Sequence, residues 1–278
     1  MGIKNYLLSR SNSFQYYKNN NIKLNKDIDN LKKQIEICRK NNNLLNESIN
    51  DVVSSGIERF CPICNKKVPF FTVINGRKHA SCPSCHSLER TRLLFYYIKK
   101  YYNDIFNLKE NKKLLHFAPE KQLFSIFSRL NNLDYWPVDI NPNNYNIRKQ
   151  VDMCDIPFED DYFDFIISCH VLEHIPNDIK AMSELYRVVK SDGVVFLMVP
   201  LFRDLDKTFE NEEYNTDELR TKYFGQKDHV RKYAMDFKDR LESVGFNVST
   251  FGPEDIDKNL VVKYGVSNKN DIVFICKK

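Results

Sequence analysis

The chain has 278 residues, of which 42% are hydrophobic, so it is long enough to bury a core of its own. Its 42 basic and 37 acidic side chains leave a formal net charge of +5, which is too small to indicate a nucleic-acid partner. It has no apolar run of the roughly 18 residues that a membrane span needs, and its first residues lack the apolar centre of a signal peptide. We therefore expect a cytoplasmic protein without a membrane partner.

The first part of the chain is polar and then becomes periodic. Residues 1–19 are rich in asparagine and predict a mobile N-terminus. From Leu24 onward, apolar residues recur at alternating spacings of four and three, as in the heptads of a coiled coil. This seam consists of Leu24, Ile28, Leu31, Ile35, Cys38, Asn42, Leu45, Ile49 and Val52.

Asn42 occupies the seam position that isoleucine takes elsewhere, and a buried Asn there pairs with its copy and specifies a parallel dimer. Residues 20–58 are therefore expected to form a coiled-coil helix that makes a homodimer through residues 24–52. The alternative is one long helix packed on its own domain, with Asn42 facing water.

Two Cys-x-x-Cys pairs follow, with 17 residues between them, which is a spacing typical of a four-cysteine zinc site. The other four cysteines are scattered, so a metal in a reducing compartment fits better than a disulfide framework. Four thiolates would complete the coordination sphere, so the zinc ion would be structural. His79 and His86 are nearby and either could replace a cysteine, but we prefer the cysteines as ligands. These ligands are Cys61, Cys64, Cys82 and Cys85.

The next elements alternate between helix and strand. Ser87 can cap a helix that runs to about Tyr102, so residues 59–104 are expected to be a zinc ribbon with a connecting helix. Strands are predicted at 112–117 and 135–140, with a helix at 122–130 between them.

Two continuous apolar runs, 163–168 and 194–199, flank a helix capped by Asn177, and such runs suit strands covered on both faces. A strand–helix–strand unit of this kind belongs to an open parallel sheet, whose ligands bind beyond the carboxyl ends of the strands. Residues 105–278 are therefore expected to form an α/β domain. After a charged segment at 204–224 that suits a lid, we expect a helix at 235–244 and strands at 246–251 and 272–276.

The segments VDMCDIPFEDDYFDFIISCHVLEH and ELYRVVKSDGVVFLMVP closely resemble the class I S-adenosylmethionine (SAM)-dependent methyltransferases, in particular the type 11 group. The cysteine pairs, together with SLER at 87–90, LLHFAPE at 114–120 and GQKDHVR at 225–231, are similar to a zinc-ribbon-bearing subgroup of that group. The resemblance implies a Rossmann-like sheet with helices on both faces, SAM and structural Zn²⁺ as cofactors, and a small-molecule or glycan acceptor. The chain departs from the family pattern in its first loop, which has no glycine, and at Asn211, where the subgroup has an aspartate.

Two carboxylates are central to the expected cofactor site. Asp139 ends a strand, where an acidic group accepts hydrogen bonds from ribose hydroxyls, and the family aspartate at position 155 approaches the adenine amino group. The small side chain of Ala118 stands in for a glycine of the first loop. The cofactor-binding residues are expected to be His116, Ala118, Glu120, Asp139, Asp155, Ile156 and His170.

Methyl transfer to oxygen needs a base, and histidine suits that role near neutral pH. The candidates are His229, His170 and His174, and we favour His229 because Asp228 could orient it. The substrate-binding residues are expected to be Asp228, Arg231, Thr208 and Glu210.

Two other interpretations are left open. One is a nucleic-acid-binding or RNA-modifying protein that uses basic residues of the ribbon, namely Lys66, Lys67, Arg77 and Lys78. The other is a scaffold that kept the fold and lost catalysis, which the glycine-free first loop suggests.

Overall fold

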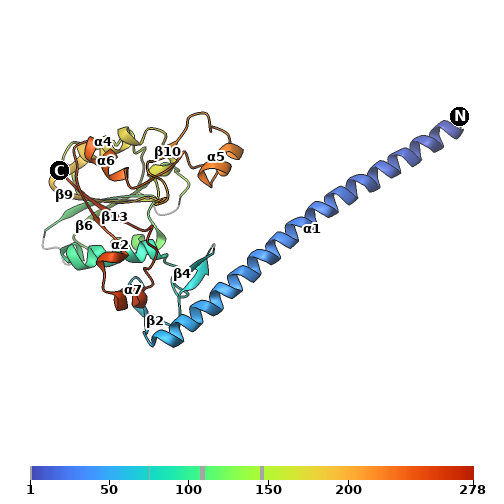
Figure 1. Ribbon diagram of the computed structural model, residues 1–278. Helices are drawn as coiled ribbons and strands as arrows, with labels where there is room; N and C mark the ends of the chain where they lie inside the picture. The colour runs from blue at the N-terminus through green and yellow to red at the C-terminus, as the bar shows by residue number, and fades with distance from the viewer. Residues whose placement is uncertain (1, 75, 107–109, 145–146) are drawn as a thin grey trace.

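The computed structural model describes residues 2–74, 76–106, 110–144 and 147–278. Its longest element is helix α1 (Gly2–Ser55), which projects away from the rest of the chain as a single rod (Figure 1). Mobility of residues 1–19 stays a prediction, but the helix runs back to Gly2 without interruption. The physical reason is that neither proline nor glycine interrupts the chain between positions 3 and 55. The helix ends before Gly56, which has a φ of +61° and provides the left-handed residue that terminates many helices.

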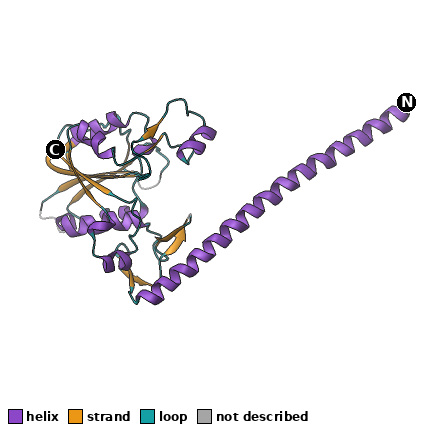
Figure 2. Ribbon diagram, viewed as in Figure 1, coloured by secondary structure: helices purple, strands orange, loops and turns teal. Residues whose placement is uncertain are grey.

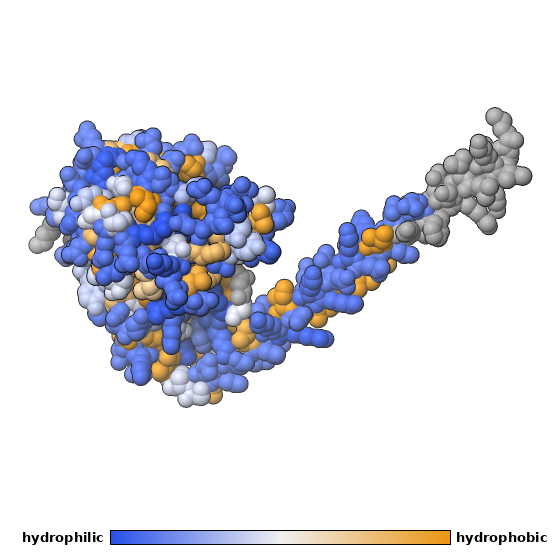
Figure 3. All heavy atoms as spheres, turned by 45° about the horizontal axis from the view of Figure 1, so that its top comes forward, coloured by the Kyte–Doolittle hydropathy of each residue, from blue (hydrophilic) through white to orange (hydrophobic). Residues whose placement is uncertain are grey.

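The predicted seam of α1 faces solvent along most of its length. Leu24, Leu31 and Ile35 are each more than half exposed. Figure 3 shows apolar side chains along the projecting helix. Helix α1 contacts β3 (Thr72–Ile74) and β4 (Arg77–Ser81), and Leu31 and Ile35 line a groove beside Thr72 and Val73, yet both side chains stay more than half exposed.

The cysteine-containing region consists of two antiparallel hairpins. β1 (Arg59–Cys61) pairs with β2 (Lys66–Val68), and β3 pairs with β4. Helix α2 (Glu89–Tyr101) and the short 3₁₀ helix η1 (Asn103–Phe106) follow. The predicted helix is present, but its N-cap is Leu88, and Ser87 is buried instead beside the cysteines.

The central sheet has seven strands in the order β12-β13-β9-β8-β5-β6-β7. Strands β5 to β9 are parallel, whereas β13 is antiparallel to both of its neighbours. Their bounds are β5 (Lys112–Phe117), β6 (Leu133–Asp139), β7 (Lys149–Gln150), β8 (Phe163–Cys169), β9 (Val189–Met198), β12 (Asn247–Phe251) and β13 (Val273–Lys277). The predicted Rossmann-like sheet, with a final antiparallel pair, is confirmed.

Helices cover both faces of this sheet (Figure 2). On one face, α4 (Asp178–Val188) and α6 (Phe237–Ser243) pack into a core that contains Leu185 and Phe274. On the other face, α2, α3 (Lys121–Phe127) and α7 (Lys258–Tyr264) pack around Phe196 and Ile275. The strands are apolar on both sides because each face is buried under helices.

Two regions differ from the sequence prediction. β9 begins at Val189 rather than 194, because Gly193 lets the backbone pass close to β8: a Cβ there would lie 3.0 Å from the carbonyl oxygens of Phe163 and Asp164. The insertion between β9 and α6 is more regular than the expected lid. It contains β10 (Phe209–Glu210) paired with β11 (Arg231–Lys232), and α5 (Asp217–Phe224).

The remaining 3₁₀ helices are η2 (Leu172–His174) and η3 (Pro253–Asp255). Among the described residues, no helix combines the length and the apolar character that crossing a bilayer requires.

Candidate functional site

The carboxyl ends of β5, β6 and β8 meet at one edge of the sheet. The order of the strands reverses at β5, which has β6 on one side and β8 on the other. Phe117, the last residue of β5, pairs with Val138 of β6 and Ser168 of β8. Ligands of open parallel sheets bind at such a point. A cavity of about 250 Å³ lies here, with Ala118, Phe124 and Asp139 among its lining residues.

The loop that follows β5 contains no glycine but adopts a backbone conformation that glycine favours. Ala118 has a φ of +44°, which is in the left-handed region that favours glycine. Its amide donates a hydrogen bond to the carbonyl oxygen of Val138 at 2.8 Å, so the loop is held against β6. Its methyl side chain is exposed and small, so a ligand can approach the backbone.

The two expected carboxylates are placed differently. Asp139 is buried and lines the cavity, and its carboxylate accepts hydrogen bonds from the amide of Asn141 at 2.8 Å and from Nδ2 of Asn144 at 2.6 Å. These bonds hold the loop after β6 in place. Asp155 is exposed and is not among the residues that line this cavity. Its contact with the adenine ring therefore stays a prediction.

The predicted cofactor-binding roles of two residues are corrected. Ile156 is buried, and its amide donates to Glu184 at 3.0 Å, so that amide is not free for a cofactor. The His116 ring is fully buried, and its two nitrogens lie 3.0 Å from the hydroxyl of Tyr135 and 3.3 Å from the carboxylate of Glu120. His116 thus positions Glu120 from beneath the loop and does not face the cavity.

Glu120 stands among charged and ionisable neighbours at the same edge. Burial alone would raise the pKa of Glu120, but the hydrogen bond and the charge of His116 hold it below its usual value. Arg90 of α2 adds to this effect and also acts on Cys169, at the end of β8, whose thiol pKa burial raises well above normal. Nε of Arg90 is buried without a hydrogen-bond partner. Arg90 belongs to the SLER segment, but no cofactor role was predicted for it.

A second cluster follows β8 directly. His170 has a φ of +57°, and its amide donates to the carbonyl oxygen of Met198 at 2.8 Å. Its Nδ1 lies 3.4 Å from Oε1 of Glu173, a side chain that is only 1% exposed. The side chain of His170 is 22% exposed, so the ring can be reached from outside.

His174 and His229 complete this cluster from two segments. Their rings meet edge to face with centroids 4.7 Å apart. Nδ1 of His174 lies 3.2 Å from the backbone oxygen of Asp228 and 3.4 Å from its Oδ2. His229 is 5% exposed, and burial lowers its pKa, so its imidazole is neutral at neutral pH.

The expected substrate residues are mostly engaged by the protein itself. Arg231 is buried, and its guanidinium donates to the carbonyl oxygens of Leu172, Ile175 and Pro176 and to Glu210 at 2.8 Å. We therefore correct its role from substrate binding to holding η2 against the insertion.

The other two predicted substrate residues of the insertion are held in a similar way. Thr208 donates through its hydroxyl to Asp236 at 2.6 Å, and Glu210 also pairs with Arg240 at 3.0 Å. Glu210 and Arg231 do line a cavity of about 660 Å³ at the start of α4, but their charges already neutralise each other. Asp228, in contrast, is 59% exposed.

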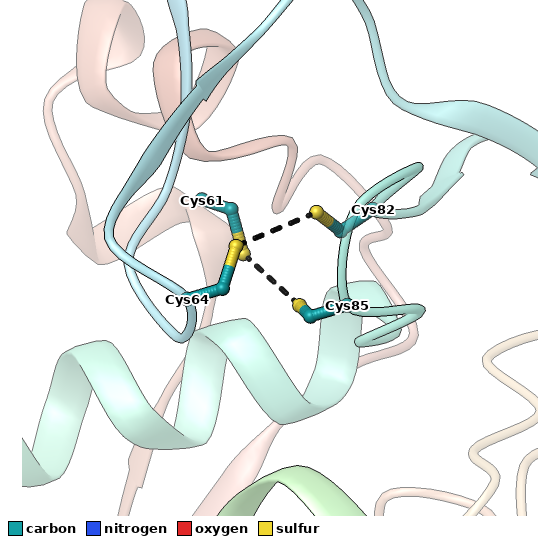
Figure 4. A group of neighbouring side chains, drawn as sticks. All are labelled: Cys61, Cys64, Cys82 and Cys85. Carbon is teal, nitrogen blue, oxygen red and sulfur yellow. Dashed lines mark hydrogen bonds between the residues drawn. The ribbon is translucent and has the colours of Figure 1, made fainter.

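The four cysteines converge between the two hairpins, as Figure 4 shows. Their sulfur atoms all lie within 4.8 Å of one another, with Cys61 and Cys85 at 3.7 Å and Cys64 and Cys82 at 3.9 Å. Four sulfurs bound at ~2.3 Å to a tetrahedral ion would lie about 3.8 Å apart. The thiols therefore fit one zinc ion.

His79 and His86 do not belong to this four-residue cluster. Nε2 of His79 instead lies 3.5 Å from Asp51 of α1, and His86 is exposed. The preference for cysteines over these histidines agrees with the geometry.

A seven-stranded sheet of this order, with a candidate cofactor cavity at the reversal point, defines a class I SAM-dependent methyltransferase. Residues 90–250, more than half of the chain, match the methyltransferase domain family. The chain belongs to this family.

Solved structures with a similar fold are distant in sequence. A SAM-dependent methyltransferase from Archaeoglobus fulgidus is 15% identical, with a TM-score of 0.42, over 66% of this chain and 93% of that one. The phosphoethanolamine N-methyltransferase 2 of Haemonchus contortus, in complex with SAM, is 16% identical, with a TM-score of 0.42, over 66% and 52%. The cyclase SpnF is 13% identical, with a TM-score of 0.49, over 84% and 93%. No curated protein matches the chain.

Proposed function

We propose that this methyltransferase methylates an oxygen atom and that His170 is the base. The observation that carries the proposal is the pair that His170 forms with Glu173 at the end of β8. A carboxylate at Nδ1 fixes the tautomer that leaves Nε2 free to accept a proton, and it stabilises the imidazolium that forms. His229, which the sequence favoured, is too deeply buried to meet an acceptor.

SAM, when bound, supplies a methyl group on a positively charged sulfur. The protein has to hold the acceptor oxygen in line with that methyl group and exclude water. Ala118 and Asp139 supply the cofactor edge, and Arg90 offers a cation for the carboxylate of the methionine moiety. With SAM and an acceptor bound, Nε2 of His170 would take the proton of the acceptor hydroxyl as the methyl group leaves the sulfur for that oxygen.

We propose a small-molecule or glycan acceptor rather than a nucleic acid. Three of the four basic residues considered for nucleic acid are already paired with acids: Lys67 with Glu58, Arg77 with Glu89 and Lys78 with Glu47. Paired charges release few counterions and give weak phosphate binding.

His170→Gln tests the base. The wild-type protein is first screened with hydroxylated small molecules and oligosaccharides for release of S-adenosylhomocysteine. The variant should then lose turnover by at least about 100-fold while calorimetry shows unchanged SAM affinity. Lys238→Gln, on the exposed side of α6, is the control. Turnover within a few-fold of wild type would exclude His170 as the base, and absence of SAM binding in the wild type would favour the inactive scaffold.

We also propose that the four cysteines hold structural Zn²⁺, which the sulfur separations support. Elemental analysis should find a zinc ion in the wild-type protein. The Cys64→Ser variant should lose this ion and should melt at a lower temperature.

A third proposal is that α1 makes a parallel dimer through residues 24–52 in the cytoplasm. The exposed seam supports it, because an apolar stripe on a long helix is normally covered by another surface. Exposed ion pairs along the helix, such as Lys32 with Asp29 at 3.9 Å, stabilise the isolated helix only slightly. Ile35→Lys should shift the sedimentation mass from dimer to monomer, whereas Lys33→Gln, outside the seam, should not. A wild-type monomer at all concentrations would contradict the dimer.

A further inference from the structure

Two segments that are far apart in sequence bring a carboxylate and two imidazoles together. Glu173 and His174 lie on η2, and His229 lies just before β11. Each of the three offers a ligand atom, and these atoms lie within 4.8 Å of one another. We propose that Glu173, His174 and His229 bind one divalent metal ion, separate from the four cysteines.

The cluster contains polar atoms with unused capacity. Oε2 of Glu173 and Nδ1 of His229 are both buried and have no hydrogen-bond partner. Their side chains are 1% and 5% exposed, so both lie away from bulk solvent. Buried polar atoms are nearly always paired in folded proteins, and a cation coordinated by this cluster would satisfy the carboxylate and an imidazole together.

Asp228, the residue before His229, orients the ring of His174 so that it can coordinate a metal ion. Nδ1 of His174 lies 3.2 Å from the backbone oxygen of Asp228 and 3.4 Å from its Oδ2. A proton on Nδ1 leaves Nε2 as the ligand atom, and Nε2 faces Glu173, 4.0 Å from its Oε1. Histidines that bind metals usually have their other nitrogen held by a carboxylate or carbonyl oxygen in this way.

The backbone of the two segments is also tied together. The amide of Val230 donates to the carbonyl oxygen of Glu173 at 2.9 Å. The buried guanidinium of Arg231 donates to the carbonyl oxygens of Leu172, the first residue of η2, and Ile175, the residue after it. The three ligands are therefore presented by a rigid frame, as a metal site requires.

Two imidazoles and one carboxylate suit Zn²⁺, Fe²⁺, Co²⁺ or Mn²⁺, whereas Ca²⁺ and Mg²⁺ prefer oxygen ligands. Three protein ligands leave at least one coordination position open. Oε1 of Glu173 remains with His170, so the metal ion and the proposed base share one carboxylate. Any part that this ion plays in methyl transfer rests on the proposed function, whereas metal binding does not.

The test counts metal ions without SAM or acceptor, so it is independent of methyl transfer. The full-length protein with its ribbon zinc in place is titrated with ZnCl₂ or CoCl₂ and examined by native mass spectrometry and calorimetry. Wild type should bind one ion beyond the ribbon zinc, and His174→Gln combined with His229→Gln should bind none beyond it. Asp228→Asn should weaken the extra ion by about 10–100-fold, whereas Asp206→Asn, an exposed carboxylate of the same insertion, should not.

If circular dichroism shows that the double variant is unfolded, His174→Gln alone serves, because this side chain is 35% exposed and its replacement disturbs less packing. Wild-type protein that takes up no ion beyond the ribbon zinc at millimolar Zn²⁺ or Co²⁺ overturns the proposal. So does an extra ion that stays bound with unchanged affinity in a folded His174→Gln variant.

Discussion

Arg92→Ala is expected to lower the free energy of unfolding by about 3–5 kcal/mol. Arg92 lies on α2, is fully buried and joins the ribbon to the sheet domain. Its guanidinium donates to carbonyl oxygens on three segments, with the ring of Phe71 4.1 Å below it. These oxygens belong to His79 at 2.8 Å, Ala80 at 3.4 Å, Ser87 at 2.5 Å, Tyr264 at 2.8 Å and Gly265 at 2.7 Å.

The magnitude follows from what truncation would leave behind. Alanine removes the donors and leaves these carbonyl oxygens in a buried cavity, where an unsatisfied group costs about 1–3 kcal/mol. Counting the four short bonds at the low end gives about 4 kcal/mol. For a protein of this size that loss corresponds to a fall of about 10 °C in melting temperature. Burial lowers the pKa of Arg92, whereas negative charge at Cys61, Cys82 and Cys85 opposes that shift.

Urea unfolding followed by circular dichroism, with zinc present, measures the effect. Arg203→Ala is the matched control, because Arg203 makes an exposed ion pair with Glu254 at 3.2 Å, and such a pair contributes at most about 1 kcal/mol. Arg92→Lys keeps the charge without the planar fork and should fall between the two. An unfolding midpoint for Arg92→Ala equal to that of Arg203→Ala would refute the reasoning.

Three other outcomes are expected. Ala118→Gly should stabilise the fold by about 1 kcal/mol in urea, because glycine adopts a φ of +44° without strain; a destabilised variant would show that the methyl group packs productively. Arg90→Met should weaken SAM binding by roughly 10-fold or more in calorimetry, because the variant loses a charge-assisted bond to a carboxylate, and unchanged affinity would remove Arg90 from the cofactor site. Burial raises the pKa of Asp271 to about 7, above the unfolded value, so the protein loses stability as pH rises from about 4 to 7. Asp271→Asn should therefore melt at a higher temperature than wild type at pH 8 and at a similar temperature at pH 4, and equal melting at both pH values would contradict the shift.

The sequence alone determined the elements whose signal is local. Continuous apolar runs predicted β8 and the second half of β9, because a strand buried on both faces needs no polar residue. Asn177 was predicted as a cap, and its side chain accepts a hydrogen bond from the amide of Lys180 at 3.0 Å. The cysteine spacing predicted the cluster in the ribbon, and the ends of the apolar runs predicted that Ala118, Asp139 and His170 lie at one edge of the sheet.

Only the tertiary structure decided which side chains face that edge and which are enclosed. His116, Ile156 and Arg231 carry the right chemistry at the right strand ends, yet burial and internal hydrogen bonds occupy them. Glu173 and His229 meet because the insertion folds back on η2, and nothing in the local pattern of either segment encodes that path. Contacts between residues so far apart depend on how the whole chain packs, so periodicity and spacing do not predict them.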